Sequence, residues 1–355
     1  MLIEGGESKS CCSALFVELT QPKQLSLSNF IFDNCVSEKS GAAVYASTSI
    51  LNKEAKIDFT NFSFTNNKNN ENGGAVFIET SDLASILMID SYFTHNVAKN
   101  GGSIFIAEKT SESSCLVDIW NCQFIKDEAL ESGGSIFMSA KSGATIDCCN
   151  FTQPKATVNG KAISIDIYSC ININKCNFYM EKDSIENSAI YVFSSFVQKQ
   201  RSFDGELLIK GGCFVCNKKG GKATFLIFNV SQASKLKITH DSCFQLSKEE
   251  SILIIGSSTT IDVDDSVFNR NDCNGIPIPP DDDKKVLTTL LIVAIVLMVV
   301  AIICLVFLIV YVVKKRKERN DDDLNKSVYS VNLLQTVWFH FGNSLKYILI
   351  NDINN

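Results

Sequence analysis

Cysteine is the residue type through which this chain could do chemistry most directly. The sequence holds 14 cysteines, and nearly all of them precede a long apolar run close to the C-terminus. Cys213 and Cys216 form a CxxC pair, which is the spacing of a redox dithiol or of half a zinc site. Because no second ligand pair accompanies it, this motif by itself is weak support for either chemistry.

Three further cysteines recur at one position of a repeated pattern. Cys122, Cys149 and Cys176 each lie two residues before a phenylalanine. If successive repeats stack as strands, the three cysteines become neighbours at the spacing between strands, which is close enough for the Cα–Cα distance of a disulfide. Two of them could then form a disulfide, or all three could form a ladder of small buried thiols. The sequence leaves both outcomes open.

Groups for acid–base catalysis do not gather in the same way. The histidines are His95, His240 and His340, and about five repeats separate the first two. No nucleophile, base and orienting group suggest themselves as a set. We therefore expect no enzyme activity and no cofactor. The formal net charge of −6 also argues against nucleic acid as a partner.

One group of carboxylates remains near the end of the repeats, at Asp262, Asp264 and Asp265. Solenoid enzymes that cut acidic polysaccharides use such clusters, so a polysaccharide-degrading enzyme is an alternative function. Asp262 and Asp264 flank the apolar Val263, so strand alternation places both toward solvent. We interpret the group as the charged cap that a stack of repeats needs at its end.

The repeat that positions these residues is marked by phenylalanine. Nine phenylalanines recur at spacings of 24 to 36 residues, at Phe32, Phe64, Phe93, Phe124, Phe151, Phe178, Phe214, Phe244 and Phe268. A small residue within a Gly-rich apolar segment follows seven of them after 9 to 11 residues, at Ala43, Ala75, Ser103, Ser135, Ala162, Ala189 and Ala223. A period near 30 residues is typical of a repeat architecture.

The segment before each phenylalanine alternates apolar and polar residues, which predicts a half-buried strand ending at that phenylalanine. Before Phe244 the apolar pair Leu236 and Ile238 comes one residue early, which predicts a β-bulge. Each repeat is then a strand, a bend and a strand. Stacked repeats bury their apolar faces, so we predict an all-β, right-handed parallel β-helix of about nine rungs over residues 1–275. The alternative is a β-sandwich of hairpins, which would not keep a fixed period.

Glycine pairs and aromatic residues recur in the same register. Gly73-Gly74, Gly101-Gly102 and Gly133-Gly134 each precede a strand, which predicts a tight corner there. Aromatic residues recur two positions after the small residue and predict a column, at Phe16, Tyr45, Phe77, Phe105, Phe137, Tyr191 and Phe225. The sequence does not decide whether this column or the neighbouring one of Val76, Ile104 and Ile136 faces inward.

Differences in repeat length fall between the small residue and the next phenylalanine, so one corner of the rung should carry the variable loops. Such loops often form the binding side of a solenoid. The longest has its tip at 198–204, and basic and aromatic residues from it and the next rung are our candidate ligand-binding patch: Lys199, Arg201, Phe203, Lys218, Lys219 and Lys222. The alternative is an ordinary solvated loop.

Residues 286–313 carry no charge over 28 positions, which is enough for one tilted transmembrane helix. A basic run from Lys314 to Arg319 follows, so residues 314–355 should form a cytoplasmic tail. Residues 276–285 form a short Pro-containing linker, and the repeats lie outside the cell. Residues 1–20 lack the pattern of a signal peptide and begin inside a repeat, so we expect further rungs and a signal upstream of Met1.

An exported chain permits disulfides, and in a eukaryotic host it also permits N-glycosylation. The sequence contains candidate glycosylation sequons at Asn61, Asn150 and Asn229.

Two alternating motifs carry a resemblance to a known family. They are Gly73-Gly74-Ala75-Val76, Gly101-Gly102-Ser103-Ile104 and Gly133-Gly134-Ser135-Ile136, together with Phe64-Thr65-Asn66-Asn67, Phe93-Thr94-His95-Asn96 and Phe268-Asn269-Arg270-Asn271. This alternation resembles the chlamydia-type polymorphic outer membrane protein (Pmp) repeat. The resemblance implies a surface-displayed β-helix acting in adhesion and antigenic variation. The bacterial family ends in a translocator domain, whereas this chain ends in one apolar run and a basic stop, as in a eukaryotic, protozoan-like surface protein.

These features favour a single-pass plasma-membrane protein whose rod binds another cell, the matrix or a glycan. The expected partners are a membrane and an extracellular protein or glycan. The second hypothesis is a structural or antigenic coat protein, and the polysaccharide-degrading enzyme is the third.

Overall fold

The computed structural model places the repeats in one compact unit, Met1–Ile278. It describes residues 2–4, 7–8, 14–19, 24–48, 55–80, 83–108, 114–140, 143–167, 170–180, 188–193, 205–216, 224–230, 234–255, 259–270 and 273. The predicted linker, transmembrane segment 286–313 and tail lie outside these residues. Over the ranges described, the structure contains no helix with the length and apolar character needed to cross a bilayer.

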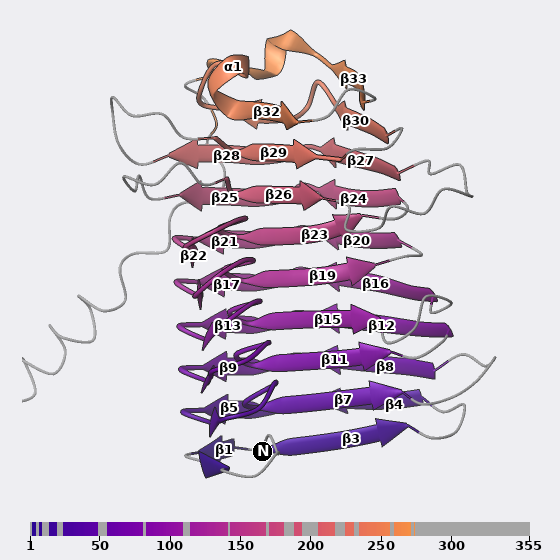
Figure 1. The fold of residues 1–355 in the computed structure, drawn as a ribbon, viewed down its shortest axis with the longest axis vertical. Helices are drawn as coiled ribbons and strands as arrows, with labels where there is room; N and C mark the ends of the chain where they lie inside the picture. Colours follow the sequence, from indigo (N-terminus) through magenta and orange to yellow (C-terminus); the bar gives the residue numbers. More distant parts are fainter. Residues whose placement is uncertain are drawn as a thin grey trace, which may run out of the picture. The chain divides into compact units, whose positions relative to one another are not determined.

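Four parallel sheets run along the stack (Figure 1). Sheet A contains β1 (Leu2–Glu4), β5 (Ile31–Asp33), β9 (Ser63–Thr65), β13 (Tyr92–Thr94), β17 (Gln123–Ile125), β21 (Asn150–Thr152), β25 (Asn177–Met180), β28 (Cys213–Cys216) and β31 (Cys243–Phe244). Sheet B contains β2 (Glu7–Ser8), β6 (Val36–Ser37), β10 (Lys68–Asn69), β14 (Val97–Ala98), β18 (Glu128–Ala129) and β22 (Lys155–Ala156).

Sheet C contains β3 (Leu15–Leu19), β7 (Val44–Thr48), β11 (Val76–Thr80), β15 (Ile104–Glu108), β19 (Ile136–Ala140), β23 (Ile163–Ile167), β26 (Ile190–Phe193), β29 (Leu226–Asn229) and β32 (Ile252–Ile255). Sheet D contains β4 (Gln24–Ser28), β8 (Ala55–Thr60), β12 (Leu83–Ile89), β16 (Ser114–Trp120), β20 (Gly143–Asp147), β24 (Cys170–Asn174), β27 (Gly205–Lys210), β30 (Ser234–Ile238) and β33 (Thr259–Val263).

Among the described residues each turn runs through sheets A, C and D in that order, and the first six turns add a sheet B strand between A and C. Each strand pairs with its equivalent one turn away. The prediction of an all-β parallel solenoid is therefore confirmed, and the hairpin sandwich is wrong because the sheets contain parallel neighbours. Sheets A, C and D hold nine strands each among the described residues. The solenoid has about seven turns, where nine rungs were predicted.

Stacked phenylalanines fill the interior beneath sheet A. Consecutive rungs place their phenylalanines in register, as in the pairing of Phe93 with Phe124 and of Phe124 with Phe151. The ring centroids of both pairs lie 4.8 Å apart and the rings are nearly parallel. Aromatic rings bury large apolar areas, so this ladder supplies much of the core.

The prediction of two strands per repeat was too simple. Each of the first eight phenylalanines, from Phe32 to Phe244, belongs to a short strand of its own in sheet A, between two sharp corners, rather than ending the alternating strand of sheet D. Asn61 before β9 and Asn66 after it have φ of 57° and 56°, the left-handed region that asparagine tolerates better than most residues. Single left-handed residues thus turn the chain where we predicted continuous strand.

The asparagines of the first two FxxN motifs, Asn67 and Asn96, form an internal hydrogen-bond ladder along the corner after sheet A. Asn67 Oδ1 accepts from the backbone N–H of Cys35 at 3.1 Å, and Asn96 Oδ1 accepts from that of Asn67 at 3.0 Å. Asp127 Oδ1 accepts from the N–H of Asn96 at 3.0 Å. Both asparagines and Asp127 are fully buried, so the ladder satisfies backbone groups that water cannot reach.

The predicted glycine corners are confirmed at the entrance to sheet C. Gly101 has φ of 61°, and a Cβ added to Gly102 would lie 2.0 Å from the carbonyl oxygen of Gly134 in the next turn. Glycine is needed at Gly102 because adjacent turns approach each other through their backbones.

We expect Gly102→Ala to lower the free energy of unfolding by about 3 kcal/mol, because the methyl group must push two backbones apart. Chemical denaturation followed by circular dichroism measures this loss. Ala42→Gly is the matched control, since Ala42 occupies the same corner of an earlier turn and already carries a methyl group. Its expected cost is only about 1 kcal/mol, and equal losses for the two variants would contradict the tight approach at Gly102.

The last turn departs from the repeat in three ways. The predicted bulge is wrong, because Ile238 pairs in register with Ile209 and the extra residue lies in the corner Thr239–Ser242 instead. The helix α1 (Lys248–Ser251) and the 3-10 helix η1 (Asp265–Val267) are the only described helices. Phe268 follows η1 outside sheet A, with its ring 5.1 Å from that of Phe244 and tilted by 40°.

Candidate functional sites: an outer aromatic column and a cysteine cluster

The six residues of the predicted ligand-binding patch lie outside the described residues. The strands that flank them are nevertheless informative. Residues 194–204 connect β26 of sheet C to β27 of sheet D, whereas residues 217–223 connect β28 of sheet A to β29 of sheet C. The two connections therefore adjoin opposite ends of the sheet C strands, and the patch itself stays a prediction.

The corner predicted to carry length variation is confirmed. Each connection from a sheet C strand to the following sheet D strand is where the spacing differs between turns, from two residues between β11 and β12 to eleven between β26 and β27. The corners around sheet A keep a nearly constant length because the phenylalanine and asparagine ladders fix them.

A row of aromatic side chains covers the outer face of sheet C. We call Phe16, Tyr45, Phe77, Phe105 and Phe137 the outer aromatic column. Successive ring centroids lie 5.2, 5.1, 5.4 and 4.8 Å apart, because the five strands pair in register. The neighbouring column of Val76, Ile104 and Ile136 is fully buried, which settles the orientation that the sequence left open.

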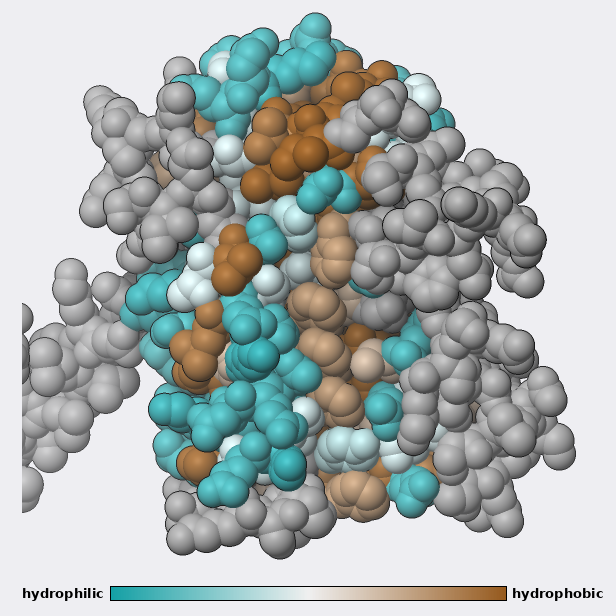
Figure 2. Space-filling view, in the orientation of Figure 1, coloured by the Kyte–Doolittle hydropathy of each residue, from teal (hydrophilic) through white to brown (hydrophobic). Residues whose placement is uncertain are grey.

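The column is interrupted in the later turns. Ser164 occupies its position in β23, and the predicted Tyr191 takes it again in β26. In β29 the position belongs to Ile227, and the predicted Phe225 is buried at the entrance to that strand. Toward the last turn the face becomes aliphatic, with Leu253 46% exposed and Ile255 45% exposed. Figure 2 shows this hydrophobic band along the molecule and its wider end near the last turns.

The orientation of the rings decides which ligands the column can bind. Interplanar angles between neighbours are 10°, 19°, 7° and 4°, so each ring covers the face of the next. Sugars stack on free ring faces, whereas the rings of this column that reach the surface offer their edges, which carry the positive end of the aromatic quadrupole. Phe77, in the middle of the column, is only 8% exposed. Ring edges suit aromatic faces, aliphatic groups and carbonyl oxygens of a polypeptide better than they suit a glycan.

Carboxylates border the column on the same face. The hydroxyl group of Tyr45 donates to Glu79 Oε2 at 3.4 Å, and Glu79 pairs in register with Ser47 in the neighbouring strand. Burial and the negative charge of Glu79 raise the pKa of Tyr45, so its hydroxyl stays neutral and remains a donor. The face therefore combines apolar ring edges with acidic groups.

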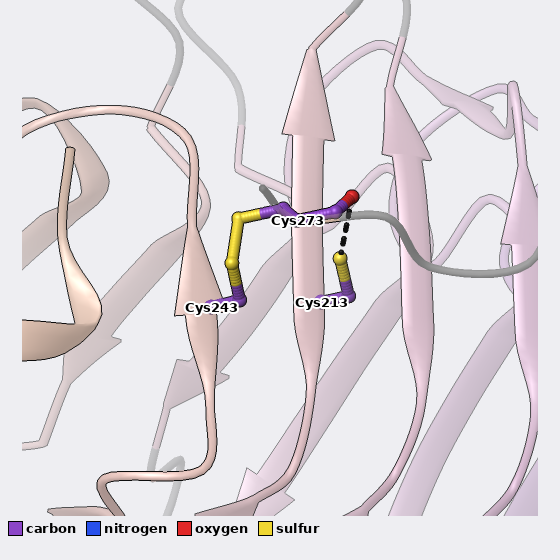
Figure 3. A group of neighbouring side chains, drawn as sticks. All are labelled: Cys213, Cys243 and Cys273. Carbon is purple, nitrogen blue, oxygen red and sulfur yellow. Dashed lines mark hydrogen bonds between the residues drawn. A yellow bond between two sulfur atoms is a disulfide. The ribbon is translucent and has the colours of Figure 1, made fainter. Parts of the chain in front are cut away.

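Cys213, Cys243 and Cys273 lie close together on the outer side of sheet A, in the last two turns. Cys213 and Cys243 pair in register on β28 and β31, and Cys243 forms a disulfide with Cys273. The Cys213 thiol donates a hydrogen bond to the carbonyl oxygen of Cys273 at 3.2 Å (Figure 3). All three sulfur atoms lie within 4.8 Å of one another. In the bridged form only Cys213 carries a thiol, so the cluster does not offer three thiolates to a metal ion.

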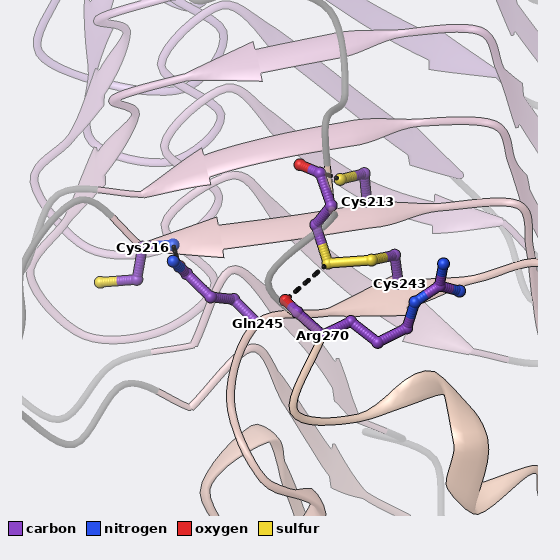
Figure 4. The surroundings of a disulfide bond; sticks show 6 residues. Cys213, Cys216, Cys243, Gln245 and Arg270 are labelled. Atoms are coloured by element: carbon purple, nitrogen blue, oxygen red, sulfur yellow. Dashed lines mark hydrogen bonds between the residues drawn. A yellow bond between two sulfur atoms is a disulfide. The ribbon is translucent and has the colours of Figure 1, made fainter.

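The CxxC pair does not converge on this cluster. The alternation of β28 turns Cys216 into the hydrophobic core, whereas Cys213 lies on the outer side of the strand. Figure 4 shows Cys216 apart from the three clustered sulfur atoms. Cys213 and Cys216 therefore cannot act together as a zinc ligand pair or a redox dithiol. Sequence reasoning missed the partner Cys273, although the shared register of Cys213 and Cys243 was visible in their position one residue before a phenylalanine.

Cys122, Cys149 and Cys176 form the predicted ladder of buried thiols and no disulfide. The three cysteines lie in the corners immediately before β17, β21 and β25, whose first residues pair in register. A spacing of about 4.8 Å between turns exceeds the roughly 3.5–4.5 Å between the Cβ atoms of a disulfide. The Cα–Cα distance between neighbouring turns would allow a disulfide, but the distance between the Cβ atoms would not. Each thiol donates instead to a corner carbonyl, as from Cys176 Sγ to Asn174 O at 3.2 Å.

The three candidate glycosylation sites lie on the outside of the turns. Asn61 is exposed at a corner, and Asn150 and Asn229 are partly exposed on sheets A and C. The side-chain N–H group of Asn61 donates to Asn29 Oδ1 at 2.6 Å, and that of Asn229 donates to the Tyr191 hydroxyl at 3.0 Å. Glycosylation at these sites stays a prediction.

The carboxylates at the end of the stack each have a structural partner. Asp262 lies 3.4 Å from Lys237 Nζ, and Asp265 lies 2.6 Å from Lys248 Nζ. Asp264 Oδ1 caps η1 by accepting from the backbone N–H of Ser266. Hydrogen bonds from the Ser266 side chain and from its backbone lower the pKa of Asp264. This arrangement agrees with a charged end cap, because the three groups are spread over three structural contacts and do not surround a common point.

Comparison of the chain with protein-family models, with curated proteins and with solved structures gives no match.

Proposed function

We propose that this chain is a single-pass surface protein whose right-handed β-helix binds an extracellular polypeptide along the outer face of sheet C. The outer aromatic column is the observation that carries the proposal. An extended hydrophobic band on a protein surface is uncommon and marks surfaces that bind partners. The edge-on rings and the bordering carboxylates favour a protein ligand with apolar and basic side chains over a glycan.

The cellular setting of this proposal rests on the sequence. Residues 286–313 would cross the plasma membrane, with the repeats outside and residues 314–355 in the cytoplasm. The resemblance to Pmp repeats supports an adhesive role for the stack. No nucleic acid and no cofactor are part of the proposal.

The test compares binding of the purified chain to cells and to matrix proteins before and after the column is interrupted. We expect Phe105→Ser with Phe137→Ser to weaken binding at least about 10-fold, which corresponds to about 1.4 kcal/mol. Serine is chosen because Ser164 already occupies the equivalent position two strands on from Phe105. The control is Leu116→Ser with Trp120→Ser, which removes exposed apolar side chains from the outer face of sheet D.

The proposal is supported if the variant with Phe105→Ser and Phe137→Ser loses binding while the control with Leu116→Ser and Trp120→Ser keeps it. Unchanged binding in the variant with Phe105→Ser and Phe137→Ser, with its fold verified by circular dichroism, overturns the assignment of the column. A separate variant with residues 198–204 scrambled reports whether the predicted basic loop contributes.

A further inference from the structure

We propose that Cys213, Cys243 and Cys273 form a thiol–disulfide exchange site, in which Cys213 can replace Cys243 as the partner of Cys273. The proposal rests on one thiol held beside one disulfide within the last two turns. The three sulfur atoms lie within 4.8 Å of one another, and the Cys213 thiol contacts the residue that it would attack through the 3.2 Å hydrogen bond to the Cys273 carbonyl.

The site is built on the regular register of sheet A. Cys213 and Cys243 occupy the same position of neighbouring strands and are 7% and 8% exposed. Cys273 reaches them from outside the sheet, after the chain has passed β33 and η1. Because the thiol and the disulfide are prepositioned and shielded from solvent, reaction between them is favoured over reaction with a dissolved thiol.

The spacing of the strands decides which sulfur is attacked. A bridge between Cys213 and Cys243 would join in-register neighbours, whose Cβ atoms stay about 4.8 Å apart. That separation exceeds the roughly 3.5–4.5 Å of a disulfide. Cys273 is not bound by this register, so Cys213 attacks Cys273 Sγ.

The exchange needs no external oxidant or reductant. Cys213 loses its proton to solvent, and its thiolate sulfur forms a bond to Cys273 Sγ while the Cys243–Cys273 bond breaks. Cys243 leaves as a thiolate and takes a proton from solvent. One disulfide and one thiol are present before and after the step, and the segment ending at Cys273 is then tied to β28 in place of β31.

The experiment asks which cysteine is the free one. The purified full-length chain is incubated at about pH 5 or about pH 8.5, then quenched in acid, denatured and alkylated with N-ethylmaleimide. Digestion without reduction followed by mass spectrometry assigns the alkylated and bridged cysteines. Because the thiolate is the nucleophile, we expect the form with free Cys243 and a Cys213–Cys273 bridge to appear faster at the higher pH. Its rate should not depend on protein concentration.

Variants give a second, independent measurement. Cys243→Ser should carry a Cys213–Cys273 bridge, and Cys216→Ser should behave as the parent does because Cys216 faces the core. If all of the parent protein still carries an alkylated Cys213 and a Cys243–Cys273 bridge after prolonged incubation at about pH 8.5, the proposal is overturned. Cys213 and Cys273 both alkylated in a folded Cys243→Ser variant would do the same. The parent experiment decides the question if that variant fails to fold.

Discussion

Asp127→Asn is expected to stabilise the repeats by about 4 kcal/mol at a pH above neutrality and to remove most of the pH dependence of their stability below it. Asp127 is completely buried, and burial raises the pKa of its carboxyl group from 3.8 to about 7. Each unit of pKa shift corresponds to about 1.4 kcal/mol, so the roughly three-unit difference gives the expected magnitude.

The sign follows from the raised pKa. The folded state binds the proton of Asp127 more tightly than the unfolded state, so the contribution is fully favourable below the unfolded pKa. Stability then falls as the pH rises from 3.8 to about 7, because the unfolded chain loses its proton first. Above that range the folded protein holds a buried ionised carboxylate that pairs with no opposite charge among the described residues, and the loss is complete.

Asparagine should be accepted because the ladder already uses it in earlier turns. The side-chain N–H group of Asn96 donates to the carbonyl oxygen of Phe64 at 3.0 Å, and a new asparagine could donate to the carbonyl oxygen of Phe93 in the same way. Asp127 Oδ2 has no hydrogen-bond partner among the described residues, so this donor would replace an unsatisfied atom.

Chemical denaturation at several pH values between about 4 and about 8 measures the difference between the parent and Asp127→Asn. Asp118→Asn on the exposed face of β16 is the control, and its effect should stay within about 0.5 kcal/mol. Parallel pH profiles for the parent and Asp127→Asn would show that Asp127 does not titrate as argued.

Phe124→Ala is the second change with a large expected effect, a loss of about 4 kcal/mol in the free energy of unfolding. Phe124 is 0% exposed and stacks between Phe93 and Phe151 at 4.8 Å on both sides. Its removal leaves a cavity in the middle of the ladder, which the in-register neighbours cannot close without shifting their own strands.

The matched control is Phe16→Ala in the outer aromatic column. Phe16 also stacks on a neighbouring ring, at 5.2 Å from Tyr45, but it is 50% exposed. We expect its loss to cost about 1 kcal/mol, because much of its surface is already in water. Chemical denaturation of both variants compares the two ladders, and similar losses would mean that the inner one does not dominate the core.

The sequence determined the architecture because a repeated need for burial leaves a repeated signal. Phenylalanines such as Phe93 and Phe124 recur near every 30 residues, and one turn cannot bury such a side chain without the next. The glycine corners were predictable for a related reason, since Gly101 and Gly102 stand where a Cβ would strike the backbone. Both signals are local in sequence and recur in each turn.

Tertiary structure decided the features that depend on distances between turns. Strand alternation could not tell whether Phe105 or Ile104 faces inward, because both are apolar, and only the folded turn shows Ile104 buried and Phe105 on the outer face. The thiols of Cys122 and Cys149 looked close enough to bridge until the parallel register fixed their Cβ spacing.

Tertiary structure also decided the chemical properties of Asp127 and Cys273. Asp127 resembles any polar corner residue in sequence, and only burial by the turns on either side raises its pKa. Cys273 finds Cys243 because the chain folds back over the last turn, a contact that no repeat encodes. A periodic sequence specifies the contacts that recur in each turn. Contacts made only once, such as the disulfide at the end of the stack, follow from the folded geometry.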